Sequence, residues 1–188
     1  EMQRSLVGSE MCIRDSPKKE QVTDYELGYQ YTGNNWHAGA NFYYMAYDNQ
    51  IAQTGQTSDI GEALTTNIKD SYRMGVELTA GWAPLSWMSV EGNAALSQNK
   101  IKDFDEYLGD HVNHYDKSTL AYSPSAILNG FLDFHYQGFN ATWHTNFVSK
   151  QYVDNSESSE RQLPSFSQTD INMSYTINLK GCGLKSVK

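Results

Sequence analysis

Long apolar runs, proline, cysteine and basic charge are all scarce in this sequence of 188 residues. The apolar runs extend for only a few residues, far short of the roughly 20 that a membrane-spanning helix needs, so a helical membrane protein is excluded. Only 14 Lys and Arg face 22 Asp and Glu, which leaves a net charge of -8 and argues against a nucleic-acid partner, since phosphates require a basic stripe. A membrane β-barrel remains possible, because its alternating strands average to a hydrophilic chain. The 13 tyrosines and 14 glycines favour it.

Residues 1–16 differ in their residue pattern from the rest of the chain. They have neither a charged start with a long apolar segment nor a small-residue cleavage site, so we do not interpret them as a signal peptide. Residues 5–16 resemble the translation of a sequencing adapter, and we therefore expect 1–16 to be a non-native segment. Setting it aside leaves Cys182, and one cysteine forms neither an intrachain disulfide nor a cysteine-rich metal site.

From residue 17 onward, apolar and polar residues alternate with a period of two. One such apolar series consists of Trp36, Ala38, Ala40, Phe42, Tyr44 and Ala46. Successive side chains of a strand point to opposite faces of the sheet, so this alternation predicts two-faced β-strands. We predict seven strands, at 20–31, 36–48, 70–82, 87–99, 124–136, 139–150 and 168–179.

Short and long connections alternate strictly between the predicted strands. The short ones carry turn-forming residues and lie at 32–35, 83–86 and 137–138. The long ones are polar and lie at 49–69, 100–123 and 151–167. A sheet with short turns at one end and long loops at the other is typical of outer-membrane barrels. Strands of about 12 residues also exceed the roughly 5–6 of globular sheets and suit the roughly 9–11 that cross a membrane.

The positions that we assign to the apolar face of these strands carry no Asp, Glu, Lys or Arg. Lipid explains this absence, because a Lys or Arg at the bilayer midplane costs roughly 2–4 kcal/mol. Aromatic residues beside the short turns, such as Tyr31, Trp36 and Trp82, predict a girdle at the periplasmic interface. The opposite face predicts a wet lumen. Its charged lining residues are Glu26, Arg73, Glu77, Glu91, Asp133 and His135.

A soluble barrel or sandwich with its apolar face turned inward would show the same alternation. Strand length, aromatic banding and loop alternation favour the membrane alternative. Seven strands are too few to close around a useful lumen, and bacterial single-chain barrels use even numbers. The predicted fold is therefore all-β, an open antiparallel meander of about seven long strands that forms a fragment of a transmembrane β-barrel.

Three short motifs occur in a recognisable order. They are Tyr25-Glu26-Leu27-Gly28, Gly75-Val76-Glu77-Leu78, and Leu163-Pro164-Ser165-Phe166 followed by Asp170. With these motifs, residues 17–188 resemble the C-terminal half of the barrel of a TonB-dependent outer-membrane receptor. That family has a plugged barrel of about 22 strands. The resemblance implies a partial barrel at 17–188, truncated at both ends and without the plug or signal peptide, in the outer membrane of a Gram-negative bacterium.

The resemblance also implies a function. The family binds a scarce nutrient, such as a ferric siderophore, haem, cobalamin or an oligosaccharide, and imports it with TonB-derived energy. The implied partners are outer-membrane lipid, the small-molecule nutrient, and the TonB complex, which is reached through a missing N-terminal region. The alternatives are a passive porin-like barrel and a soluble lipocalin-like carrier. No enzyme activity, catalytic residue or cofactor is expected, since no catalytic motif occurs.

The connection at 100–123 is the best candidate for contacting a ligand, because it combines carboxylates, imidazoles and phenols. Its candidate residues are Tyr107, His111, His114, Tyr115 and Asp116. On a helical turn, His111 and His114 would share one face, and such groups suit a transition metal. A solvated acidic loop explains the same composition, however, and we predict no metal site. Lumenal carboxylates could also form a glycosidase pair, but no feature of the sequence sets their separation.

Overall fold

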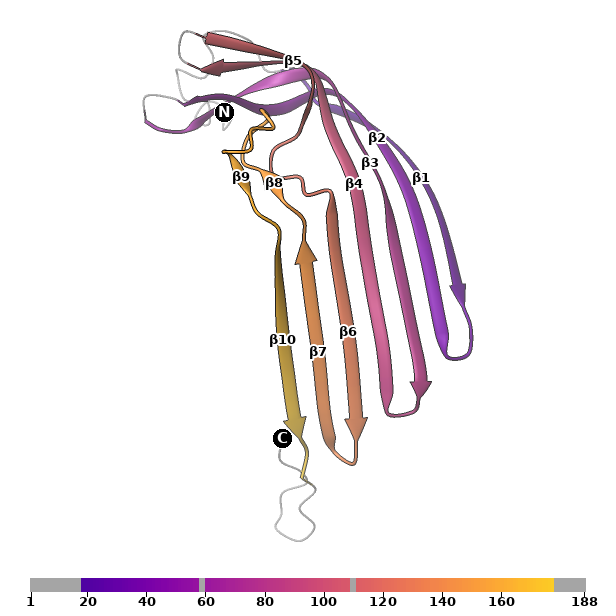
Figure 1. Cartoon of the computed structure of the whole chain (residues 1–188). Coiled ribbons are helices and arrows are strands. Elements are labelled where there is room, and N and C mark those ends of the chain that lie inside the picture. Colours follow the sequence, from indigo (N-terminus) through magenta and orange to yellow (C-terminus); the bar gives the residue numbers. More distant parts are fainter. Residues whose placement is uncertain (1–17, 58–59, 109–110, 178–188) are drawn as a thin grey trace, which may run out of the picture.

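The computed structural model describes residues 18–57, 60–108 and 111–177. Figure 1 shows one curved antiparallel sheet, open on one side, with three tight turns gathered at one end. The opposite end carries additional hairpins and short strands. The described part of the chain contains no helix able to cross a membrane. The all-β, open-meander prediction is confirmed.

The described residues form ten strands. In chain order these are β1 (Gln21–Thr32), β2 (Trp36–Thr57), β3 (Ala63–Leu85), β4 (Met88–Leu108), β5 (His111–Thr119), β6 (Ala126–Tyr136), β7 (Phe139–Val148), β8 (Gln151–Tyr152), β9 (Gln162–Leu163) and β10 (Phe166–Tyr175). The main sheet has the order β1-β2-β3-β4-β6-β7-β10, and β5 pairs with β4 beyond β6. Strands β8 and β9 pair separately.

All seven predicted strands are present, but two predicted connections are wrong in large part. Most of 49–69 extends the β2–β3 ladder as far as the pair Thr57 and Ala63. Most of 100–123 continues β4 and adds β5, which pairs back to it. The few apolar residues of these hairpins, such as Ile68 and Ile101, are separated by stretches of polar residues, so the hydrophobic alternation did not reveal the hairpins. The predicted end of the last strand, 178–179, lies outside the described residues.

The register separates the sheet into two faces. Leu27 lies opposite Phe42, Phe42 opposite Val76, and Val76 opposite Leu96. We call the face that carries this row the apolar face. Glu77, next to Val76 in sequence, points the other way and defines the polar face.

The apolar face is uncovered. Leu27 is 74% exposed and Phe42 is 56% exposed. The buried hydrophobic residues of the described chain all lie at the end away from the tight turns; they are Ala52, Ile68, Ile101 and Phe104. The part of the sheet between the tight turns and that end therefore has no hydrophobic core, as expected for strands whose apolar side chains contact lipid.

Two aromatic bands bound the apolar face. Near the turns, Tyr31 stacks on Trp36 at 4.5 Å, and Trp82 lies opposite Trp36 in the register. Toward the other end, Tyr44 stacks on Tyr72 at 6.0 Å. Trp82 and Tyr72 are about 10 residues apart on β3, which is the length of a tilted strand that crosses a bilayer.

Replacing Gly75 by alanine should destabilise the sheet. Gly75 lies opposite Tyr43, and a Cβ there would clash with the Leu96 carbonyl oxygen and lie 2.6 Å from the Tyr43 hydroxyl. Because a backbone atom must move, we expect a loss of about 1–3 kcal/mol in urea unfolding of the lipid-reconstituted protein. Gly130→Ala is the matched control, since its Cβ would meet nothing within 4 Å. Equal losses in both variants would contradict this packing.

Candidate functional site

The end of the sheet away from the turns is built from three segments. These are the outer parts of β2 and β3, the β4–β5 hairpin, and the segment 151–163, which contains β8 and β9. We call this assembly the loop cap. Its small apolar core consists of Ala52, Ile68, Ile101 and Phe104, with Tyr115 and Leu120 packed against it.

Two residues beside this core have a left-handed backbone. Asn49 has a φ of 58° and Asp103 a φ of 53°, a conformation that Asn and Asp tolerate better than most residues. Ile101 and Phe104 are both buried although they are three residues apart on one strand. Asp103 lies between them and interrupts the alternation of faces, so both side chains reach the same side.

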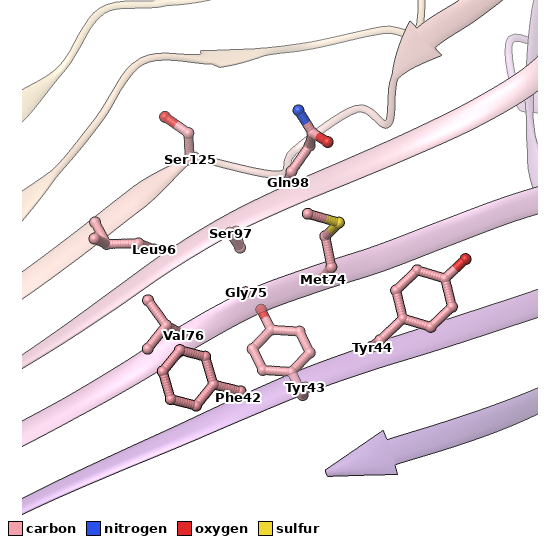
Figure 2. Close-up of a pocket in the computed structure, with 10 residues that line it drawn as sticks. All are labelled: Phe42, Tyr43, Tyr44, Met74, Gly75, Val76, Leu96, Ser97, Gln98 and Ser125. Carbon is pink, nitrogen blue, oxygen red and sulfur yellow. The ribbon is translucent and has the colours of Figure 1, made fainter. Parts of the chain in front are cut away.

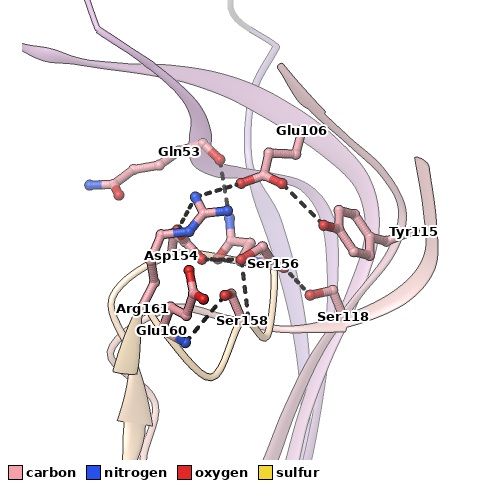
Figure 3. Close-up of polar contacts among 10 residues, drawn as sticks. Gln53, Glu106, Tyr115, Ser118, Asp154, Ser156, Ser158, Glu160 and Arg161 are labelled. Atoms are coloured by element: carbon pink, nitrogen blue, oxygen red, sulfur yellow. Dashed lines mark hydrogen bonds and ion pairs between the residues drawn. The ribbon is translucent and has the colours of Figure 1, made fainter. Parts of the chain in front are cut away.

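A buried carboxylate joins the segment 151–163 to the β4–β5 hairpin. Glu106 is only 1% exposed. Arg161 Nη1 lies 3.0 Å from Glu106 Oε1 and 2.6 Å from Asp154 Oδ2, as Figure 3 shows. The Tyr115 hydroxyl donates to Glu106 Oε2 at 3.1 Å. Both oxygens of the buried carboxylate therefore have a partner, which such a burial requires.

The charges of this network reinforce one another. Burial alone would lower the pKa of Arg161, but the carboxylates of Asp154 and Glu106 outweigh it and raise that pKa. Burial also raises the pKa of Tyr115, and its hydrogen bond to Glu106 adds to the effect. At neutral pH, Arg161 therefore remains a cation and Tyr115 remains a phenol that donates.

Asn155 connects all three segments of the loop cap. It is 3% exposed, its Nδ2 donates to the Gln53 carbonyl at 3.1 Å, and its Oδ1 accepts from the Ala121 amide at 2.8 Å. The Ser118 hydroxyl donates to the Asn155 carbonyl oxygen. A second ion pair lies nearby, where Lys100 Nζ is 2.6 Å from Glu157 Oε1.

The exposed side of the β4–β5 hairpin carries a histidine among carboxylates. His114 Nδ1 lies 2.7 Å from Asp105 Oδ1. Its Nε2 lies 3.7 Å from Asp103 and 3.5 Å from Asp116. Within the described ranges, no group of three or more His, Cys, Asp or Glu is arranged to hold a metal ion.

The hairpin should be more ordered in mild acid. The hydrogen bond to Asp105 raises the pKa of His114 above 6.5; burial opposes this rise, and the charges of Asp105, Asp103 and Asp116 add to it. A raised folded pKa means that the stabilisation is complete below pH 6.5 and is lost as pH rises through the folded value. We expect slower amide exchange in 100–119 at pH 5.5 than at pH 8, after correction for intrinsic rates. His114→Gln should abolish this difference, and its persistence would contradict the assignment.

The six predicted lumen residues all lie on the polar face. The register places Glu26 opposite Tyr43 and Glu91 opposite Phe131, and the remaining four follow the same alternation, at Arg73, Glu77, Asp133 and His135. The Arg73 guanidinium lies 5.1 Å from the Tyr47 ring centroid. Its buried Nε has no hydrogen-bond partner among the described residues. That these residues line a lumen stays a prediction.

An asparagine row on the same face was not predicted. Asn129 Nδ2 donates to Asn93 Oδ1 at 2.9 Å, and Asn146 Nδ2 donates to Asn129 Oδ1 at 2.9 Å. His144 stacks on Phe131 with 4.3 Å between ring centroids. The only signal in the sequence was the repeated asparagine at polar positions of neighbouring strands.

Residues 12–187 match the family described as TonB dependent receptor-like, beta-barrel. The chain belongs to this family. The resemblance carried by the three sequence motifs is thereby confirmed, and membership places the chain in the Gram-negative outer membrane. It also decides against the soluble lipocalin-like carrier. No curated protein matches the chain.

Several solved structures share the fold of this chain. The copper transporter OprC has a TM-score of 0.65 at 20% identity, over 86% of this chain and 24% of that one. The ferric yersiniabactin uptake receptor FyuA from Yersinia pestis has a TM-score of 0.59 at 17% identity, over 83% of this chain and 22% of that one. The FrpB iron transporter from Neisseria meningitidis (F3-3 variant) has a TM-score of 0.57 at 14% identity, over 86% of this chain and 25% of that one. The chain thus spans about a quarter of the length of each.

The structure brings the candidate ligand residues into one hairpin. They lie in or beside the β4–β5 hairpin, at Tyr107, His111, His114, Tyr115 and Asp116. The helical turn considered for the two histidines is wrong, because both belong to β5, where residues three apart point to opposite faces. Tyr115 is engaged in the buried network with Glu106. Ligand contact by these residues stays a prediction.

The residues that organise the loop cap carry no distinctive local sequence pattern. Glu106, Asp154, Asn155 and Arg161 had no signal beyond lying in polar connections. A buried ion pair between segments 55 residues apart depends on the tertiary fold, and a single sequence shows no such pairing.

Cysteines at the two ends of the sheet should report which end faces the cell exterior. Ile60 is 81% exposed and Val112 54% exposed in the loop cap, whereas Asn34 lies in a tight turn. In a longer receptor containing this segment, Ile60→Cys and Val112→Cys should react with a membrane-impermeant thiol reagent on whole cells. Asn34→Cys should react only after the outer membrane is permeabilised. Labelling of Asn34→Cys alone on intact cells would invert the topology.

Proposed function

We propose that this chain forms part of the wall and outer entrance of a receptor that binds a scarce nutrient and imports it with TonB-derived energy. Family membership supports the outer-membrane location and the receptor class. The similar structures include a copper transporter and two proteins named for iron uptake. A metal ion or metal chelate, such as a ferric siderophore, is therefore the first substrate class to test, ahead of haem, cobalamin and oligosaccharides.

The ordered loop cap is the observation that carries this proposal. Three segments far apart in sequence are fastened to one another by Glu106, Arg161 and Asn155. A passive diffusion pore needs only an open mouth, whereas a receptor needs a preorganised surface, since ordering flexible loops on binding would cost affinity.

The remainder of the receptor belongs to the same proposal. Residues 17–188 supply a partial barrel, while the other strands, the plug and the segment that contacts TonB come from the rest of a longer receptor. The non-native origin of residues 1–16 stays a prediction. Sequencing the gene directly from its genome tests it, because a native segment would appear there in frame.

Growth and uptake of a strain carrying the longer receptor test the function. On a medium whose iron is chelated by a siderophore, deletion of the receptor gene should abolish growth, and deletion of tonB should do the same. A labelled ferric siderophore should still bind to cells without TonB but should not enter them. Uptake that persists without TonB and rises linearly with concentration would support the porin-like alternative.

A further inference from the structure

The apolar face carries a groove just below the outer aromatic band. Figure 2 shows its residues on three neighbouring strands, β2, β3 and β4, with Ser125 just before β6. The groove has a volume of about 560 Å³. Its floor and walls are mostly apolar and include Phe42, Tyr44, Met74, Val76, Leu96 and Gln98. The groove is shallow and open, and a depression of this chemistry on a lipid-facing surface suits a hydrocarbon chain.

Basic side chains lie immediately beyond the groove. Lys102 and Lys117 are cross-strand partners, and their Nζ atoms lie 5.9 Å and 5.1 Å from the centroid of the Tyr72 ring. The Tyr72 hydroxyl donates to Gln98 at the rim of the groove at 3.0 Å. Both lysines are exposed, and neither has an ion-pair partner within the described ranges.

Neighbouring charged residues restrict the positions at which an anion can bind. Asp70 lies opposite Lys102 in the register, and Asp48 lies opposite Asp70. Lys100 is already paired with Glu157. Since the two aspartates repel an anion from the β2–β3 side, the favourable place is between Lys102 and Lys117.

The position of these lysines matches a lipid headgroup. Tyr72 lies about one membrane-crossing strand length from Trp82, so the Tyr72 ring marks the outer interface. Lys102 and Lys117 lie one step further out, beyond the acyl region. The groove lies on the membrane side of the same ring, which places an acyl-chain pocket directly below two ammonium groups.

We propose that this surface binds a phosphorylated lipid of the outer leaflet, with one acyl chain in the groove and a phosphate between Lys102 and Lys117. Ammonium groups bind phosphate as compact point charges. The proposal rests on the outer-membrane location and not on the nutrient proposed above. Failure of one leaves the other standing.

Binding of lipid A to the longer receptor in lipid-depleted detergent tests the site. Native mass spectrometry should show that the bisphosphorylated form binds at least tenfold more tightly than its phosphate-free form. The double variant Lys102→Gln/Lys117→Gln should bind the bisphosphorylated form roughly 30-fold more weakly, or about 2 kcal/mol, since each lysine near an anionic surface contributes about 1 kcal/mol. Lys150→Gln is the matched control, because Lys150 Nζ lies 5.7 Å from the ring of Tyr152, and neither residue lines the groove, so it should change nothing.

Three results would overturn the proposal. Equal binding of the two lipid forms by the unmodified receptor would show that the groove takes only bulk lipid, and this comparison needs no variant to fold. Competition by inorganic phosphate at the lipid's own concentration would indicate a simple anion site. An equal loss in Lys150→Gln and in the double variant would indicate diffuse surface charge.

Discussion

Replacing Arg161 by methionine should release the segment 151–163 from the β4–β5 hairpin. The variant leaves the Glu106 carboxylate buried, with only the Tyr115 hydroxyl as a partner. Removing one partner of a buried ion pair costs about 3–5 kcal/mol, and we expect about 2–3 here because the Arg161 side chain is 39% exposed. Amide exchange of 151–163 in the longer receptor should therefore accelerate by roughly 30- to 150-fold.

Lys100→Met is the matched control for this prediction. It also removes one cation that pairs with the same segment, at 2.6 Å from Glu157, but the two side chains are 20% and 36% exposed. Burial alone would raise the pKa of Glu157, yet the hydrogen bonds from Lys100 and Thr119 lower it, so the pair exists at neutral pH. An exposed pair is worth about 0–1 kcal/mol, so exchange should rise by less than about sixfold.

The double variant Glu106→Gln/Arg161→Met separates loss of the pair from the cost of a buried charge. Because both charges are removed, the amide exchange of 151–163 should be slower in the double variant than in Arg161→Met, though still faster than in the unmodified receptor. Equal exchange in Arg161→Met and Lys100→Met would show that Glu106 does not fasten the segment.

The strands in the membrane-spanning part were predictable because lipid imposes a rule on every second residue. From Trp36 to Ala46 and from Tyr72 to Trp82, each side chain on the apolar face had to be uncharged, and the resulting period of two fixed both strand and face. The register was not predicted; the structure pairs Phe42 with Val76. The strands outside the membrane obey no such rule. The polar residues of β5 therefore looked like a loop.

The structure of the loop cap could not be predicted from the sequence, for a related reason. Its core needs Asp103 in a left-handed conformation so that Ile101 and Phe104 share a side. It also needs Arg161 to meet Glu106 across 55 residues. Neither event leaves a local pattern, because one is a single backbone angle and the other a tertiary contact. Composition drew attention to the connection at 100–123, but it could not identify the residues that hold the loop cap together.

Arginine at Val76 should prevent normal assembly, whereas arginine at Thr79 should be tolerated. Val76 lies on the apolar face about midway between the two aromatic bands, at Trp82 and Tyr72. Near the bilayer midplane, an arginine that faces lipid costs roughly 2–4 kcal/mol. Thr79 lies on the polar face, opposite Gly39, and is exposed there, so its replacement avoids the lipid.

The two arginine variants differ by only three positions on β3 and carry the same added charge, so their comparison isolates the face of the sheet. In the longer receptor, Val76→Arg should sharply lower the amount of folded, heat-modifiable protein in the outer membrane, while Thr79→Arg should stay near the unmodified level. Urea unfolding from lipid vesicles should give the corresponding difference in free energy, about 2–4 kcal/mol. Equal tolerance of both variants would mean that Val76 does not contact lipid, and the membrane assignment of the apolar face would then fail.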